Sequence, residues 1–176
     1  MNAVRAASLC RISLCAVVLI SSSALAHGGG SVGDIFNPGK EDTISLPSVP
    51  PKGDVSIEEA IWLRRSVRSF SEEMPSAGIV SRLLWAAQGI TDTENGLRSA
   101  PSAGATYPLE IFLATREFLA RYVPEKHCLV ITMREDVRKA LATAALEQSW
   151  FAKAPLVFVF TAVIARTSGE IGRAHV

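Results

Sequence analysis

Apolar side chains recur at the spacing of an α-helix in three stretches of the chain, which predicts three helices. The first opens with an S-x-x-E capping box at 56–59. The second is expected over 76–89, between a serine N-cap and a glycine stop, and the third over about 135–150. Trp62 and Trp85 lie within these patterns and are predicted to be core residues. The other positions expected to face inward are Ile57, Ala60, Ile61, Val80, Leu83, Leu84, Ala87, Val137, Leu141, Ala144 and Ala145.

Continuous apolar runs predict strands. The run PLVFVFTAV at 155–163 is rich in aromatic and β-branched side chains, which predicts a strand buried on both faces. Further strands are expected at 109–115 and 129–132, with a turn at 123–126 and a polar loop at 92–99. Because helices and strands mix without strict alternation, we expect an α+β (mixed α/β) fold. A doubly buried strand needs neighbours on both edges, and two further strands are expected to be too few for an independent sheet.

The N-terminus has the pattern of a targeting segment. Residues 1–26 contain two arginines, then an uncharged apolar stretch, then Ala-Leu-Ala, which predicts a signal peptide cleaved after Ala26. An uncleaved membrane anchor is the alternative, but the apolar run is short for a bilayer span. The mature protein is therefore expected to be secreted or periplasmic. Residues 27–55 are rich in glycine and proline, which indicates a leader or linker.

Charge and cysteine content narrow the possible functions. The chain has 18 Lys and Arg against 17 Asp and Glu, and the predicted cleavage removes two arginines, which leaves 16 against 17. This balance lacks the basic excess of a nucleic-acid binder. Cleavage also removes two of the three cysteines, so Cys128 would have no intramolecular disulfide partner. The three histidines are isolated from carboxylate and thiol partners, so no metal site is predicted, and His127 is interpreted as a polar hairpin residue.

Two short segments could carry chemistry. The first, RRSVRSF at 64–70, places three guanidinium groups around a serine, a pattern suited to binding phosphate or carbonyl oxygens. A solvated helix end is the alternative, because the helix dipole also favours cations there. The second, RSAPSAGATYPLEIF at 98–112, leads into a predicted strand with very small side chains. Small residues let a flat ligand or another chain approach the backbone closely, although a tight turn would also use them.

At this order and spacing, the two segments resemble those of the FMN-dependent nitroreductase family, and more specifically its azoline-oxidising dehydrogenases of thiazole/oxazole peptide biosynthesis. The resemblance covers about 44–169. It implies a nitroreductase-like fold with a central mixed sheet flanked by helices, FMN as the cofactor, and a homodimer. In the family, the arginine segment binds the flavin phosphate and ring oxygens, and the P-S-x-G loop lies against the ring, often from the partner subunit. The cofactor-binding residues implied here are Arg64, Arg65, Ser66, Arg68, Pro101, Ser102, Ala103 and Gly104.

The resemblance also marks what this chain lacks. Family members continue after the strand at 155–163 with a helix, further strands, a glycine-rich cofactor segment and a late basic residue on the phosphate. We therefore expect a C-terminally truncated domain at 56–170. The last six residues, 171–176, can be encoded by a common sequencing-adapter sequence and are expected to be a non-native tail, with a short natural C-terminus as the alternative. Tyr107 matches a family position near the active face, and packing at the strand entry is its alternative role.

These observations lead to one functional expectation. The chain is expected to be part of an exported FMN-dependent oxidoreductase that dehydrogenates a small or peptidic substrate, with the flavin carrying the redox chemistry. No side chain is assigned as a catalytic group. Reduced nicotinamides are cytoplasmic, so oxygen or a quinone is the expected electron acceptor. The alternative is a non-catalytic exported α/β module, or an inactive fragment, that has lost flavin binding.

Overall fold

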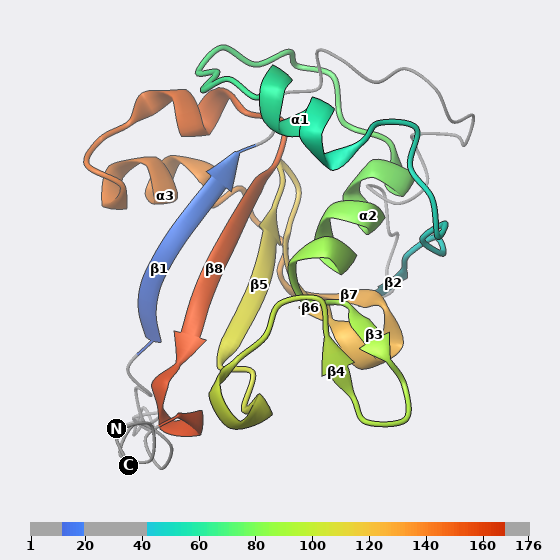
Figure 1. Ribbon diagram of the computed structural model, residues 1–176. Coiled ribbons are helices and arrows are strands. Elements are labelled where there is room, and N and C mark those ends of the chain that lie inside the picture. Colours follow the sequence, from blue (N-terminus) through green and yellow to red (C-terminus); the bar gives the residue numbers. More distant parts are fainter. Residues whose placement is uncertain (1–11, 20–41, 168–176) are drawn as a thin grey trace, which may run out of the picture.

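The computed structural model describes residues 12–19 and 42–167, which form two sheets and three α-helices (Figure 1). The strands are β1 (Ile12–Leu19), β2 (Thr43–Ser45), β3 (Ile90–Asp92), β4 (Leu97–Arg98), β5 (Leu109–Ala114), β6 (Leu119–Val123), β7 (Cys128–Met133) and β8 (Val157–Val163). The α-helices are α1 (Ile57–Leu63), α2 (Ala77–Gln88) and α3 (Arg138–Ala144). Short 3₁₀ helices are η1 (Ala103–Ala105), η2 (Pro124–Lys126), η3 (Ser149–Lys153) and η4 (Ile164–Arg166).

The large sheet has six strands in the order β1-β8-β5-β6-β7-β2, and β3 with β4 forms a separate hairpin. All pairings between the described strands are antiparallel, which corrects the expected mixed sheet. The predicted strand at 155–163 is confirmed as β8, and it has the neighbours on both edges that its burial requires. The expectation of too few strands was wrong, because β1, β2 and β6 complete the sheet.

Both faces of the central strands are covered. Val80 and Leu84 of α2 pack with Leu113 of β5 and Phe158 of β8 in one hydrophobic cluster. The next residues along the two strands face the other way, and α3 and η3 cover them with a second cluster that includes Phe151. Successive side chains of a strand point to opposite faces, so β8 is buried on both.

The helix caps follow the sequence closely in two cases. Ser56 accepts a hydrogen bond from the Glu59 N–H at 3.1 Å, and α2 runs between its Ser76 and Gly89 caps. The third helix was predicted too long, because α3 ends at Ala144 and η3 follows after a turn. The core role of Trp62 is also wrong: α1 buries none of its residues, and Trp62 is 80% exposed. Trp85 is partly buried and donates a hydrogen bond to the Ile90 carbonyl.

Two strands lie in segments that were predicted to be a signal peptide and a leader or linker. β1 lies within the predicted signal peptide and pairs with β8 along its whole length. β2 lies within the predicted leader, and the Pro47 carbonyl just after it accepts hydrogen bonds from Ser81 and His127. The cleavage point after Ala26 and the tail at 171–176 lie outside the described residues, so cleavage and a non-native tail stay predictions.

Deleting residues 1–26, the segment that the predicted cleavage removes, is expected to make the isolated chain 27–176 self-associate. The deletion uncovers one edge of β8, and an uncovered apolar strand edge is a template for pairing with another chain. Size-exclusion chromatography of the deleted and intact chains measures this. Identical elution of the two as one discrete species would show that another segment covers β8.

No helix in 12–19 or 42–167 is long and apolar enough to cross a membrane. Within the same ranges, no group of three or more histidine, cysteine, aspartate or glutamate side chains could hold a metal ion. The Cys128 thiol is free and buried.

Candidate functional site

The arginine segment leaves α1 as an extended, exposed strip of chain. Arg65 folds back and donates to the carbonyl oxygens of Trp62 and Arg64, both at 2.8 Å. The Arg68 guanidinium lies 5.9 Å from the centre of the Trp150 ring. In the described part of the chain, no carboxylate pairs with the guanidinium of Arg64 or Arg68. These two groups are therefore available to an anion, and Ser66 between them is exposed as well.

The small-residue loop is held in an unusual backbone conformation. Gly104 has a φ of 60°, and Ala105 and Tyr107 also have positive φ, at 51° and 42°. Ser102 closes the loop, because its hydroxyl accepts the Tyr107 N–H at 2.8 Å and its carbonyl accepts the Ala105 N–H. Non-glycine residues with positive φ are costly and are found preferentially where function requires them.

The outer surface of the same loop is open. Pro101, Ala103 and Gly104 are exposed, and no hydrogen bond within the described residues takes up the N–H groups of Ala103 and Gly104. Two unpaired backbone donors beside minimal side chains fit a flat ligand with acceptor atoms on its edge.

The structure does not bring these two segments together within one chain. The loop precedes Leu109 at one end of β5, whereas Phe70, the last residue of the arginine segment, stacks on Trp150 near the Ala114 end (Figure 1). Six residues of extended strand span roughly 20 Å. The two segments therefore lie at opposite ends of a central strand, and their expected roles in binding FMN stay predictions.

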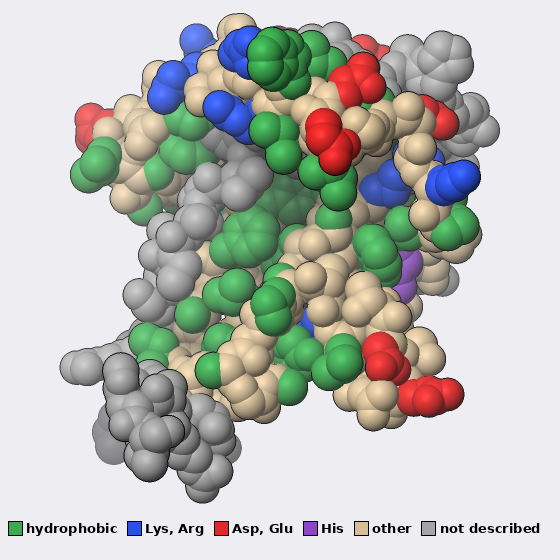
Figure 2. All heavy atoms as spheres, in the orientation of Figure 1, with side chains coloured by type: hydrophobic (Ala, Val, Ile, Leu, Met, Phe, Trp, Pro, Cys, Tyr) green, Lys and Arg blue, Asp and Glu red, His purple; other side chains and the backbone are tan. Residues whose placement is uncertain are grey.

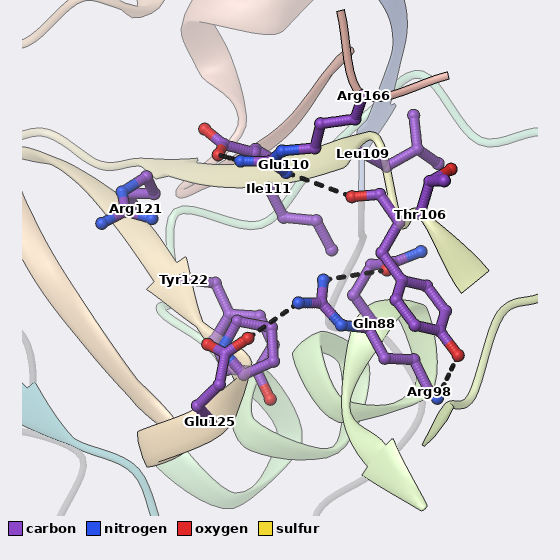
Figure 3. Close-up of a pocket in the computed structure, with 12 residues that line it drawn as sticks. Gln88, Arg98, Thr106, Leu109, Glu110, Ile111, Arg121, Tyr122, Glu125 and Arg166 are labelled. Carbon is purple, nitrogen blue, oxygen red and sulfur yellow. Dashed lines mark hydrogen bonds and ion pairs between the residues drawn. The ribbon is translucent and has the colours of Figure 1, made fainter. Parts of the chain in front are cut away.

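A cavity of about 320 Å³ opens beside the loop, between β5 and β6 (Figure 3). The two strands pair only through Phe112–Ala114 and Leu119–Arg121, and beyond this pairing they separate. The residues that line the cavity are Gln88, Arg98, Thr106, Tyr107, Leu109, Glu110, Ile111, Arg121, Tyr122, Pro124, Glu125 and Arg166. Sequence reasoning placed Tyr107 near an active face but did not identify this cavity, because its walls come from segments far apart in the chain.

Arginine side chains organise the cavity wall. Arg98 lies 4.8 Å from the centre of the Tyr107 ring, pairs with Glu125 at 2.8 Å and donates to Gln88. Arg166 donates to the Tyr107 carbonyl and pairs with Glu110 at 2.7 Å. The strained backbone at Tyr107 is thus fixed by two cations, one on its ring and one on its carbonyl.

A buried polar cluster lies behind the cavity. The hydroxyl of Ser81 is 2.7 Å from His127 Nε2, and the Tyr122 hydroxyl is 2.8 Å from His127 Nδ1. Burial raises the pKa of Tyr122 to about 12, so this hydroxyl stays protonated. Ser81 is fully buried and donates to the Pro47 carbonyl at 2.5 Å. The serine–histidine pair therefore holds the segment after β2 in place and is not an accessible nucleophile. The hairpin position predicted for His127 is confirmed, because it lies between η2 and β7.

Comparison with known proteins decides the family. The model of the family described as "Nitroreductase family" matches residues 62–175. The chain belongs to the nitroreductase family. It is 37% identical over 137 residues to "Putative nitroreductase MJ1384" of Methanocaldococcus jannaschii, which covers 74% of this chain and 68% of that protein. A crystal structure of a "putative nitroreductase" from Ralstonia eutropha JMP134 matches with a TM-score of 0.65 at 26% identity, over 88% of this chain and 68% of that one.

Membership of the nitroreductase family confirms the predicted fold class and the coarse activity, an oxidoreductase. The α+β architecture with helices around a central sheet is the architecture that the family resemblance implied. Family membership leaves the cofactor contacts, the substrate and the subunit arrangement to be inferred from the residues themselves.

Proposed function

We propose that the full-length protein is an exported FMN-dependent oxidoreductase that dehydrogenates a small or peptidic substrate. One observation carries this proposal: both segments expected to contact flavin are exposed, and each has donors with no competing partner among the described residues. Among the described residues, no carboxylate pairs with the guanidinium of Arg64 or Arg68. The backbone N–H groups of Ala103 and Gly104 likewise have no acceptor there. A buried or self-satisfied motif would have argued against cofactor binding.

The chemistry of these donors fits FMN. Guanidinium groups present fixed forks of N–H donors that match phosphate oxygens, which suits Arg64 and Arg68 to the phosphate end of the cofactor. The small side chains at 102–104 allow a planar ring to reach the backbone N–H groups, where donors stabilise negative charge on a reduced ring. When bound, FMN supplies the electron or hydride transfer. The chain itself supplies binding, orientation and electrostatic stabilisation.

A second copy of the chain would complete the site. The arginine segment and the loop lie at opposite ends of β5, so one FMN meets both only if the loop of one copy approaches the arginine segment of another. The surface around α1 favours such contact, because hydrophobic side chains gather there beside basic and acidic ones (Figure 2). The exposed apolar residues of this region are Val55, Ile57, Ile61, Trp62, Leu63 and Val67. Exposed apolar patches with a charged rim are typical of protein interfaces. We therefore infer a homodimer.

The expected location and the resemblance to azoline-oxidising dehydrogenases favour an oxidase over a nicotinamide-dependent reductase. Substrate-dependent oxygen uptake by the full-length protein, without added nicotinamide, tests this assignment. A strict requirement for nicotinamide would contradict it. Flavin absorbance in the purified protein separates an enzyme from a non-catalytic module, because a module that has lost its cofactor would be colourless.

Replacing Gly104 with valine is expected to weaken FMN binding about tenfold. A β-branched residue at a φ of 60° destabilises the loop by about 1–2 kcal/mol and fills the space next to the backbone donors. Flavin fluorescence titration measures the affinity. Gly96→Val is the matched control, since Gly96 has a φ of 67° in the β3–β4 turn with open space around it. Equal losses of affinity in the two variants would show that only stability had changed.

A further inference from the structure

The cavity between β5 and β6 does not belong to the proposed flavin site, because none of the eight residues assigned to FMN lines it. It forms because β5 pairs with β8 over its whole length, whereas β6 turns away with β7. At Leu109–Ile111, the edge of β5 that would otherwise pair with β6 borders the cavity. The opening is therefore built into the register of the sheet.

The charges around the cavity do not balance. Three arginines and two glutamates line it, and two ion pairs, Arg98–Glu125 and Arg166–Glu110, use both glutamates. Arg121 is the third arginine, and within the described residues no carboxylate or other side-chain acceptor bonds to its guanidinium. Figure 3 shows Arg121 on the β6 side of the cavity and Thr106 across from it. A partly buried cation without a partner is unfavourable unless an anion or water satisfies it.

We propose that this cavity binds a small organic carboxylate, with Arg121 as its charged anchor. One uncompensated positive charge matches one carboxylate, whereas a phosphate group carries up to two negative charges. The guanidinium fork suits the two carboxylate oxygens. Leu109 and the ring of Tyr107, both partly exposed, offer apolar contact for the remainder of the ligand. The volume of about 320 Å³ lies at the lower end of the range for small-molecule pockets, which restricts the ligand to a compact molecule.

This site would lie next to the loop proposed to hold the flavin ring, since Thr106 and Tyr107 belong to both the loop and the cavity wall. The carboxylate could then belong to the substrate of the proposed enzyme or to a separate ligand. Binding does not depend on flavin, so the two proposals can fail independently.

Benzoate is a suitable probe, because it joins one carboxylate to one compact ring. Isothermal titration of the full-length protein with benzoate is expected to show saturable binding, and the neutral analogue benzamide is expected to bind at least tenfold more weakly. Arg121→Gln is expected to lower benzoate affinity by about tenfold to a hundredfold, the usual effect of losing a charged hydrogen bond. Arg82→Gln is the matched control, because Arg82 is exposed on α2 and does not line the cavity. Thermal melts of both variants check that they remain folded.

Three outcomes would overturn the proposal. Equal affinity for benzoate and benzamide would show that charge is not recognised. Unchanged benzoate affinity in Arg121→Gln would exclude Arg121 as the anchor. Tighter binding of inorganic phosphate than of benzoate would assign the cavity to phosphate instead. Arg121→Lys refines a positive result, since it keeps the charge but removes the fork, and intermediate affinity is expected.

Discussion

The double variant Arg64→Ala/Arg68→Ala of the full-length protein is expected to bind FMN at least a hundredfold more weakly than the wild type. Each guanidinium is exposed and has no carboxylate partner in the described part of the chain, so each is available to the phosphate. Losing a charged donor costs about 1.5–3 kcal/mol, and two such losses amount to about 3 kcal/mol or more, or over two powers of ten in affinity. Flavin fluorescence titration measures the effect.

The control for this variant is Arg82→Ala, which removes one exposed arginine outside the segment. Thermal stability of the double variant is expected to stay near that of the wild type, because α1 and the following segment bury little surface. If the double variant retains FMN with unchanged affinity, the arginine segment is solvated surface and the proposed phosphate contact is wrong.

Arg138→Ala is expected to have the largest effect on stability, a loss of about 1–3 kcal/mol in the free energy of unfolding, because it leaves a buried acceptor without its donor. Arg138 is 5% exposed, and its guanidinium donates to both Asp136 oxygens and to the Ala154 carbonyl. Alanine leaves that carbonyl without its donor in the core beside β8. Urea denaturation measures the loss. Arg116→Ala is the control, because its ion pair with Glu72 is exposed and 3.7 Å long, and the expected change is below about 1 kcal/mol.

The same contact predicts a pH dependence. Hydrogen bonding from Arg138 lowers the pKa of Asp136 below its ordinary value of 3.8. A carboxyl with a lowered pKa stabilises the fold above its ordinary pKa, and this contribution is lost as the pH falls through the lower folded value. The stability gap between the wild type and Arg138→Ala is therefore expected to narrow below about pH 4. A gap that stays constant down to pH 2 would show that the ion pair is not the source of the effect.

Local signals in the sequence were sufficient where capping chemistry decides the structure. As predicted, α1 begins at the capping box of Ser56 and Glu59, and α2 lies between its Ser76 and Gly89 caps. The end of α3 could not be predicted, because Leu146 and Glu147 favour helices but adopt φ of 58° and 57°. The chain turns there so that Phe151 can pack against Ala142 and Val157. Tertiary packing outweighs local propensity at this position.

Strand β6 was missed for a different reason. Its inward residues are Ala120, which is small, and Tyr122, which has a hydroxyl, while Arg121 between them is charged. This alternation is too weakly apolar to be recognised without the neighbouring strands. The exposure of Trp62 could not be predicted either. The helical spacing of apolar residues predicts that a helix has an apolar face, but it does not show whether that face packs against the same chain.

The candidate site was predicted in parts. Arginine clusters and small-residue loops have recognisable compositions, so both donor segments could be selected from the sequence, and their roles in binding FMN stay predictions. Their separation along β5 follows from topology, which the sequence did not reveal. The cavity was missed because it joins residues as distant in sequence as Gln88, Arg121 and Arg166.

The central claim, that one FMN is shared between two copies of the chain, is tested most directly by mixing two defective variants. One lacks the guanidinium groups, as Arg64→Ala/Arg68→Ala, and the other has a blocked loop, as Gly104→Val. In a mixed dimer, the arginine segment of the second variant faces the intact loop of the first, which restores one site. Random pairing makes half of the dimers mixed, so about one quarter of all sites should regain wild-type affinity.

The measurement is FMN bound per chain after the two variants are unfolded together and refolded as an equimolar mixture. The account predicts that about a quarter of the sites in the mixture bind FMN with wild-type affinity, and that no site does so when each variant is refolded alone. Binding in the mixture that equals the mean of the two separate variants would contradict a shared site.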